Sequence, residues 1–164
     1  LSMAAIARSL GIPWRRLPGL FFKGRHEMSP AMRNIGPFDG MTDMLRELHA
    51  ERHGLFILST NTTRNINKFL RRHKLDGYFD EVYGGVGMFG KTPALRRLLR
   101  EQHIDTGKAV YVGDEVRDVM AAQALGVRAI AVTWGFARSE DLKARGAAGL
   151  ARTPRDLGRL LEKT

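Results

Sequence analysis

Residues 109–132, AVYVGDEVRDVMAAQALGVRAIAV, contain the pattern that decides the fold. Two short apolar runs, 109–112 and 129–132, enclose a segment in which Val116, Val119 and Met120 recur at helical spacing. Short apolar runs of this kind predict strands that are buried on both faces. Gly126 follows the helical segment, where glycine commonly ends a helix. The stretch therefore predicts a strand, a helix and a second strand, parallel to the first.

The same alternation extends toward the N-terminus of this unit. Residues 55–58 form another apolar run, and residues 82–83 indicate a further short strand. Apolar residues at helical spacing predict helices around Met41, Met44, Leu45 and Leu48, around Ile66, Phe69 and Leu70, around Leu95, Leu98 and Leu99, and around Leu157, Leu160 and Leu161. Strands that alternate with helices predict an α/β fold, a Rossmann-like parallel sheet with helices on both faces.

Three helix starts are predicted from capping patterns. Thr92-Pro93 and Thr153-Pro154 each place a capping hydroxyl directly before a proline, which is favoured in a first helical turn. Asp39 is interpreted as the cap of the helix that contains Met41 and Met44.

The first part of the chain has a different pattern. Residues 1–35 show helical spacing without a strand signal, and Gly36 and Pro37 then interrupt the pattern. We expect two parts, a helical part at 1–35 and an α/β part at 36–164.

Composition excludes several classes of protein. The chain has no cysteine, so disulfides and thiolate chemistry are excluded, and a cytoplasmic location is expected. No apolar stretch approaches the roughly 20 residues that span a bilayer, so no membrane partner is expected. The net charge is +10, but arginines such as Arg96, Arg97 and Arg100 are not interleaved with aromatic residues. Nucleic acid is therefore not the expected partner. The sequence does not indicate an oligomeric state.

Polar residues follow the predicted strand at 55–58. Ser59, Thr60 and Asn61 place hydroxyl groups and backbone amides before a helix, which is a natural arrangement for binding phosphate. The alternative is a helix cap, for which Thr62 or Thr63 would serve. The residues themselves leave both interpretations open.

Carboxylates follow the predicted strand at 109–112. Asp114, Glu115 and Asp118 lie within one helical turn, and such carboxylates repel one another unless a cation joins them. Mg²⁺ binds one or two carboxylates together with waters and substrate phosphate. The alternative is that Asp114 caps the helix and Asp118 is solvated. Lys91 stands at a predicted helix start, where a cation is unfavourable unless it neutralises an anion.

Together these segments resemble the haloacid dehalogenase superfamily, in its phosphoglycolate phosphatase-like branch. LFILSTN at 55–61 is similar to the second motif of the family, with Thr60 in the key position. FGKTPAL at 89–95 is similar to the third motif, with Lys91, and VYVGDEVRD at 110–118 to the fourth. Residues 1–35 resemble part of the helical cap of the family.

The resemblance implies a Mg²⁺-dependent phosphatase that acts on a small phosphorylated metabolite through an aspartyl-phosphate. Asp114 would bind the metal directly, and Asp118 would support it through water or hydrogen bonds. Thr60 and the amide of Asn61 would bind phosphate, and Lys91 would pair with the phosphate and the nucleophile. Thr60 and Lys91 are thus the expected catalytic residues of this chain.

The first motif of the family, the nucleophile sequence DxDGT after a strand, is not in this sequence. Pro37-Phe38-Asp39-Gly40-Met41 is only a partial likeness, with proline in place of the nucleophile. We therefore expect the α/β core to lack its first strand here and the nucleophile to lie on a segment upstream of Leu1. Two alternatives are a non-catalytic relative that binds phosphate and metal, and, less favoured, a basic nucleic-acid-binding domain.

Overall fold

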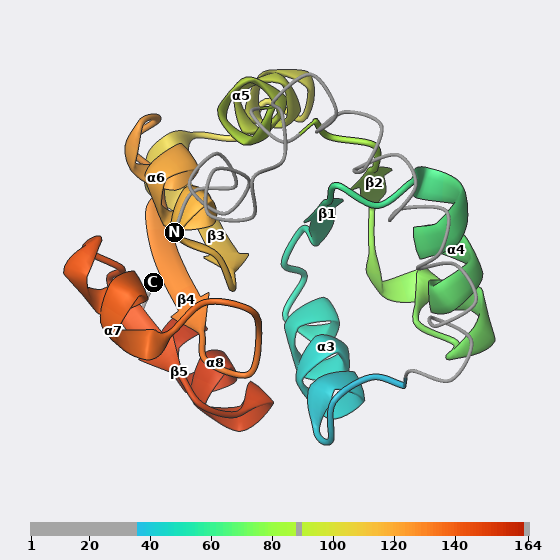
Figure 1. Ribbon diagram of the computed structural model, residues 1–164. Helices are drawn as coiled ribbons and strands as arrows, with labels where there is room; N and C mark the ends of the chain where they lie inside the picture. Colours follow the sequence, from blue (N-terminus) through green and yellow to red (C-terminus); the bar gives the residue numbers. More distant parts are fainter. Residues whose placement is uncertain (1–35, 88–89, 163–164) are drawn as a thin grey trace, which may run out of the picture. The chain divides into compact units, whose positions relative to one another are not determined.

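The computed structural model describes residues 36–87 and 90–162 (Figure 1). The helical cap predicted at 1–35 therefore lies outside the described residues. The strands are β1 Phe56–Leu58, β2 Glu81–Tyr83, β3 Val110–Gly113, β4 Arg128–Val132 and β5 Gly149–Ala151. The α-helices are α3 Met41–Ala50, α4 Thr63–Arg72, α5 Lys91–Glu101, α6 Val116–Gln123, α7 Ser139–Ala144 and α8 Pro154–Leu161. Single-turn helices, η2 Asp76–Tyr78 and η3 Thr106–Lys108, precede β2 and β3.

The strands pair in parallel, which confirms the predicted α/β class. β1 pairs with β2, and β3, β4 and β5 form a second ladder in that order, as Figure 1 shows. In the β3–β4 pair, Val112 lies opposite Ile130. Within the described part of the chain, none of the helices is both long and apolar enough to cross a bilayer.

The central strand β4 is covered on both faces. Ile130 and Val132 belong to a core that also contains residues of α3, α4 and α8, which we call the α3–α8 core. Ala129 and Ala131 belong to a second core with residues of α5, α6 and α7, which we call the α5–α6 core. Alternate residues of a strand point to opposite faces, so helices on both sides of β4 bury its residues 129–132.

The same two cores continue to β1. Ile57 packs against the α3–α8 core, whereas the next residue, Leu58, packs against the α5–α6 core. On β3, Val110 and Tyr111 divide between the two cores in the same way. The two ladders therefore share the same helical layers.

One of the three predicted helix starts is confirmed. The hydroxyl of Thr153 accepts a hydrogen bond from the amide of Asp156 over 3.1 Å, and Pro154 follows in the first turn of α8. The prediction for Asp39 is wrong, because the cap of α3 is Gly40, with φ at 81°. Glycine adopts this left-handed conformation without steric cost, so the turn is made by the residue after Asp39.

The start of α5 also differs from the prediction. The helix begins at Lys91 with Gly90 as its cap, so Thr92 lies inside the first turn instead of capping it. Pro93 is then the third helical residue, where its missing N–H removes no intrahelical hydrogen bond. This earlier start places Lys91 in the first turn of the helix.

Candidate active site

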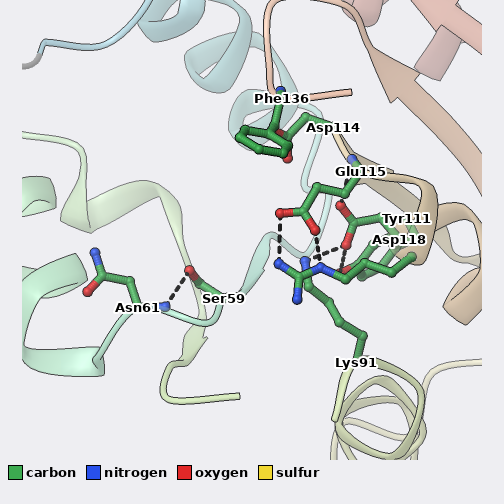
Figure 2. Close-up of polar contacts among 9 residues, drawn as sticks. Ser59, Asn61, Lys91, Tyr111, Asp114, Glu115, Asp118 and Phe136 are labelled. Carbon is green, nitrogen blue, oxygen red and sulfur yellow. Dashed lines mark hydrogen bonds and ion pairs between the residues drawn. The ribbon is translucent and has the colours of Figure 1, made fainter. Parts of the chain in front are cut away.

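Asp118 is the centre of a buried polar network at the end of β3. Its side chain is 2% exposed, and its Oδ1 atom forms an ion pair with Nζ of Lys91 (Figure 2). Oδ2 accepts a hydrogen bond from the amide of Glu115 over 3.1 Å. The Lys91 side chain is only 12% exposed, so both charges are largely removed from water. A buried carboxylate requires such partners, because an unpaired charge is strongly unfavourable in the interior.

Tyr111 completes this network from the strand itself. Its hydroxyl donates a hydrogen bond to Oδ1 of Asp118 over 3.2 Å. Burial, and then the negative charge of Asp118, raises the pKa of Tyr111 above its ordinary value, so the phenol stays neutral and remains a donor. Gly113 allows the close approach of Asp118, because a Cβ atom at Gly113 would lie 2.3 Å from Cβ of Asp118. Tyr111 and Gly113 point to the same face of β3.

Asp114 is held by the loop that follows β4. Its Oδ2 atom accepts a hydrogen bond from the amide of Phe136 over 2.9 Å (Figure 2). Its carbonyl accepts another from the amide of Ala137 over 3.0 Å. A Cβ atom at Gly135 would lie 2.1 Å from Cβ of Asp114, so this position admits no side chain without a shift. The loop therefore fixes the carboxylate of Asp114 through backbone contacts.

Glu115 caps α6 and pairs with Arg117. Glu115 and Asp118 form a capping box, in which each side chain bonds the backbone of the other residue. The guanidinium of Arg117 binds both carboxylate oxygens of Glu115, with Nη2 and Oε1 2.7 Å apart. The cap of α6 is thus Glu115, and the alternative that Asp114 caps this helix is excluded.

The turn after β1 is the second part of the site. The amide of Asn61 donates to Oγ of Ser59 over 3.1 Å, as Figure 2 shows. The side-chain oxygen of Asn61 accepts from the amide of Thr62 over 2.8 Å. Thr62 caps α4, because its hydroxyl accepts from the amide of Asn65 over 3.2 Å. Thr60 lies between Ser59 and Asn61 and is partly buried.

The loop after β2 packs on this turn. The amide of Gly85 donates to the carbonyl of Asn61 over 2.6 Å, and the amide of Val86 donates to the carbonyl of Ser59 over 3.0 Å. A Cβ atom at Gly84 would lie 2.2 Å from the amide nitrogen of Thr63. This contact between the loop and the first turn of α4 therefore requires glycine at position 84, and it holds the turn after β1 in place.

The predicted site residues thus form two groups at the carboxyl ends of two strands. Lys91, Asp114 and Asp118 lie around the end of β3, and Thr60 and Asn61 follow β1. In parallel sheets, ligands bind outside these strand ends. The structure brings Lys91 and Asp118 into contact although 27 positions separate them.

Mg²⁺ binds hard oxygen ligands, so the free carboxylate oxygens decide whether this site can hold it. Asp114 uses only Oδ2 in the bond to Phe136. Asp118 already shares its two oxygens among Lys91, Tyr111 and the amide of Glu115. Across residues 36–87 and 90–162, no group of three or more His, Cys, Asp or Glu residues is arranged to hold a metal. The described residues therefore fit a cation bound directly through one carboxylate, that of Asp114.

Sequence reasoning missed three features of this site. The apolar run around Tyr111 predicts only a strand, although strand periodicity places Tyr111 on the face of Gly113. The contacts that Gly135 and Phe136 make with Asp114 span more than 20 positions, and no local pattern reveals them. The only sequence signal for the pairing of Glu115 with Arg117 is that these oppositely charged residues are two positions apart.

The chain is similar to known proteins over most of its length. A family model described as haloacid dehalogenase-like hydrolase matches residues 1–132. A phosphoglycolate phosphatase from Synechococcus elongatus is 35% identical over 157 residues, which are 95% of this chain and 74% of that protein. A phosphoglycolate phosphatase from Aliivibrio fischeri is 28% identical over 130 residues, which are 77% of this chain and 55% of that protein.

A solved structure of a predicted phosphatase from Clostridium acetobutylicum has a similar fold. Its TM-score is 0.71 at 26% identity, and the match covers 77% of this chain and 60% of that structure. The chain therefore spans only part of the length of the proteins that it matches.

Proposed function

The chain belongs to the haloacid dehalogenase-like hydrolase family, and we propose that it forms most of a Mg²⁺-dependent phosphatase for a small phosphorylated metabolite. The observation that carries the proposal is the buried pair of Lys91 and Asp118 beside Asp114, at the end of a parallel strand. Lys91 is 12% exposed in the first turn of α5, where the helix dipole disfavours a positive charge. A lysine in this position can bind an anionic substrate.

Phosphate binding is the proposed role of Lys91 and of the turn after β1. The ammonium group of Lys91 has three N–H donors, and Asp118 uses one of them. The remaining donors would bind the phosphate and the nucleophile. The hydroxyl of Thr60 and the amide of Asn61 would bind further phosphate oxygens, for which Asn61 must exchange its bond to Ser59.

Asp114 would hold Mg²⁺, which supplies charge neutralisation to the transferring phosphoryl group when it is bound. The bond from Phe136 fixes Oδ2 of Asp114 and so orients the carboxylate. Asp118 would act mainly by holding Lys91, so its support of the metal would be indirect.

The nucleophile would come from a strand upstream of Leu1 that lies between β1 and β3. Within the described residues, β1 and β3 each have a strand partner on one side only. Both strands send alternate residues into the same two cores, so an added strand would complete one continuous sheet. Val112 on β3 is apolar but 38% exposed, as expected beside a position that another segment covers. An aspartate at the end of that strand would form the aspartyl-phosphate.

A cytoplasmic location remains a prediction.

Phosphoglycolate is the first substrate to test, because the relatives from Synechococcus and Aliivibrio are phosphoglycolate phosphatases. The test uses the protein expressed from its natural start. Phosphate release is measured with phosphoglycolate and with a panel of sugar phosphates and nucleoside monophosphates, with Mg²⁺ or with a chelator.

The proposal predicts Mg²⁺-dependent release of phosphate from at least one of these monoesters. Release that is equal with and without the chelator would contradict the metal requirement. Absence of release from every monoester, with saturable binding of inorganic phosphate, would instead support the non-catalytic alternative.

A further inference from the structure

The hydroxyl group of Tyr111 is a polar group in an otherwise apolar core. The residue is 9% exposed and packs with apolar residues of the α5–α6 core, such as Val119, Ala129 and Ala131. A phenylalanine ring would fill the same space. The hydroxyl is therefore tolerated in this core only because Asp118 accepts its hydrogen bond.

The carboxylate of Asp118 is bound by three donors, of which Tyr111 is one. Oδ2 is fixed by the amide of Glu115, and Oδ1 receives both Lys91 and the hydroxyl of Tyr111. The ammonium of Lys91 is at the end of a flexible four-carbon chain, so by itself it does not fix the orientation of the Asp118 carboxylate. The phenol is held rigidly by a strand and a packed ring, so it is the fixed donor at Oδ1.

We propose that Tyr111 is a positioning residue, which holds the carboxylate of Asp118 and through it the ammonium of Lys91. The kinetic consequence rests on the proposed phosphatase function, whereas the effect on Lys91 does not. Without the hydroxyl, the carboxylate would turn about its side-chain bonds, and Lys91 would leave its buried position more often.

The first test measures the reactivity of Lys91 in the protein expressed from its natural start. Wild-type, Tyr111→Phe and Tyr83→Phe chains are treated with an amine-acylating reagent, and mass spectrometry measures the rate at Lys91 relative to exposed Lys68. Tyr83 is a matched control, because its hydroxyl also bonds a carboxylate, Oε2 of Glu101 over 3.3 Å, but outside the Asp118 network.

Acylation of Lys91 is expected to become roughly threefold faster or more in Tyr111→Phe, because local opening exposes the amine. It should stay at the wild-type rate in Tyr83→Phe. Thermal unfolding confirms that each variant is folded before labelling. An unchanged rate in folded Tyr111→Phe would overturn the proposal.

The second test uses phosphate release by the protein expressed from its natural start. Tyr111→Phe should lower kcat about tenfold with KM nearly unchanged, since a hydrogen bond to a charged group contributes about that factor. The same substitution is then made in an Asp118→Ala background. A residue that acts through Asp118 should have no further effect on kcat there.

An equal loss of kcat in both backgrounds would overturn the proposal, because Tyr111 would then act independently of Asp118. If no variant hydrolyses any monoester, the phosphatase proposal fails. The acylation rates of Lys91 still decide whether Tyr111 positions it.

Discussion

Replacing Lys91 with methionine tests the buried ion pair directly. Methionine has a similar length, so it removes the positive charge while it retains most of the packing. The Asp118 carboxylate would remain 2% exposed, and its remaining donors among the described residues would be Tyr111 and the amide of Glu115.

The loss of stability follows from two opposing effects. Removing one partner of a buried pair costs about 3–5 kcal/mol, because the remaining charge is uncompensated. Lys91 lies in the first turn of α5, and removing a cation from this position returns about 0.3–1 kcal/mol. The expected net loss in the free energy of unfolding is therefore about 2–5 kcal/mol.

Urea unfolding, followed by circular dichroism, measures this loss. The control is Arg97→Met on the same helix, which breaks an ion pair with Glu101 whose side chains are 65% and 37% exposed. An exposed pair contributes little, because solvent screens its charges. If Lys91→Met and Arg97→Met destabilise the chain equally, the buried network does not stabilise this site as argued.

Three further predictions concern the pH dependence, the loop after β4 and the core. Burial raises the pKa of Tyr111 in the folded chain, so its contribution to stability is complete below about pH 10 and is lost as the pH rises further. Urea unfolding in alkaline buffers should therefore show a steeper fall for wild type than for Tyr111→Phe; parallel curves would contradict the burial argument. Gly135→Ala should displace Asp114, whose Cβ would be 2.1 Å from the new carbon, and lower phosphate release about 10–100-fold; an unchanged rate would show that the loop does not position Asp114. Leu142→Ala should cost about 2–5 kcal/mol in urea unfolding, because Leu142 is 0% exposed; a loss below about 1 kcal/mol would mean that this core collapses around the change.

The sequence predicts the middle of the fold well. The apolar runs at 55–58, 109–112 and 129–132 correspond to β1, β3 and β4 within one residue at each end, because strands buried on both faces need continuous apolar sequence. Spacing likewise located α3, α4, α5, α6 and α8.

Weaker patterns were missed where tertiary contacts decide the structure. The short helix α7 and the three-residue strand β5 were not predicted. Residues 149–151, GLA, have little strand preference, but Ala151 is completely buried and pairs with Val132. Packing next to β4 thus determines this strand more than its composition does.

In the candidate site, too, local sequence predicts some features, whereas tertiary contacts determine others. Strand ends point to Thr60, Asn61 and Asp114, because ligands bind at this edge of a parallel sheet. The spacing of Asp114 and Asp118 does not reveal that Asp118 bonds Lys91 and Tyr111. Lys91 on α5 and Tyr111 on β3 come from separate elements, so the spacing of residues near Asp118 does not specify these contacts. The predicted roles of these residues in metal and phosphate binding remain predictions.

The central claim, that Asp114 belongs to a phosphatase site, is tested most directly by phosphate release from phosphoglycolate. Wild type, Asp114→Asn and Asp43→Asn are compared, all expressed from the natural start and supplied with Mg²⁺. Asp43 is a matched control because its side chain is 70% exposed on α3. The account predicts that Asp114→Asn lowers the rate about a hundredfold or more, whereas Asp43→Asn leaves it unchanged. An Asp114→Asn protein that hydrolyses phosphoglycolate at the wild-type rate would contradict the account.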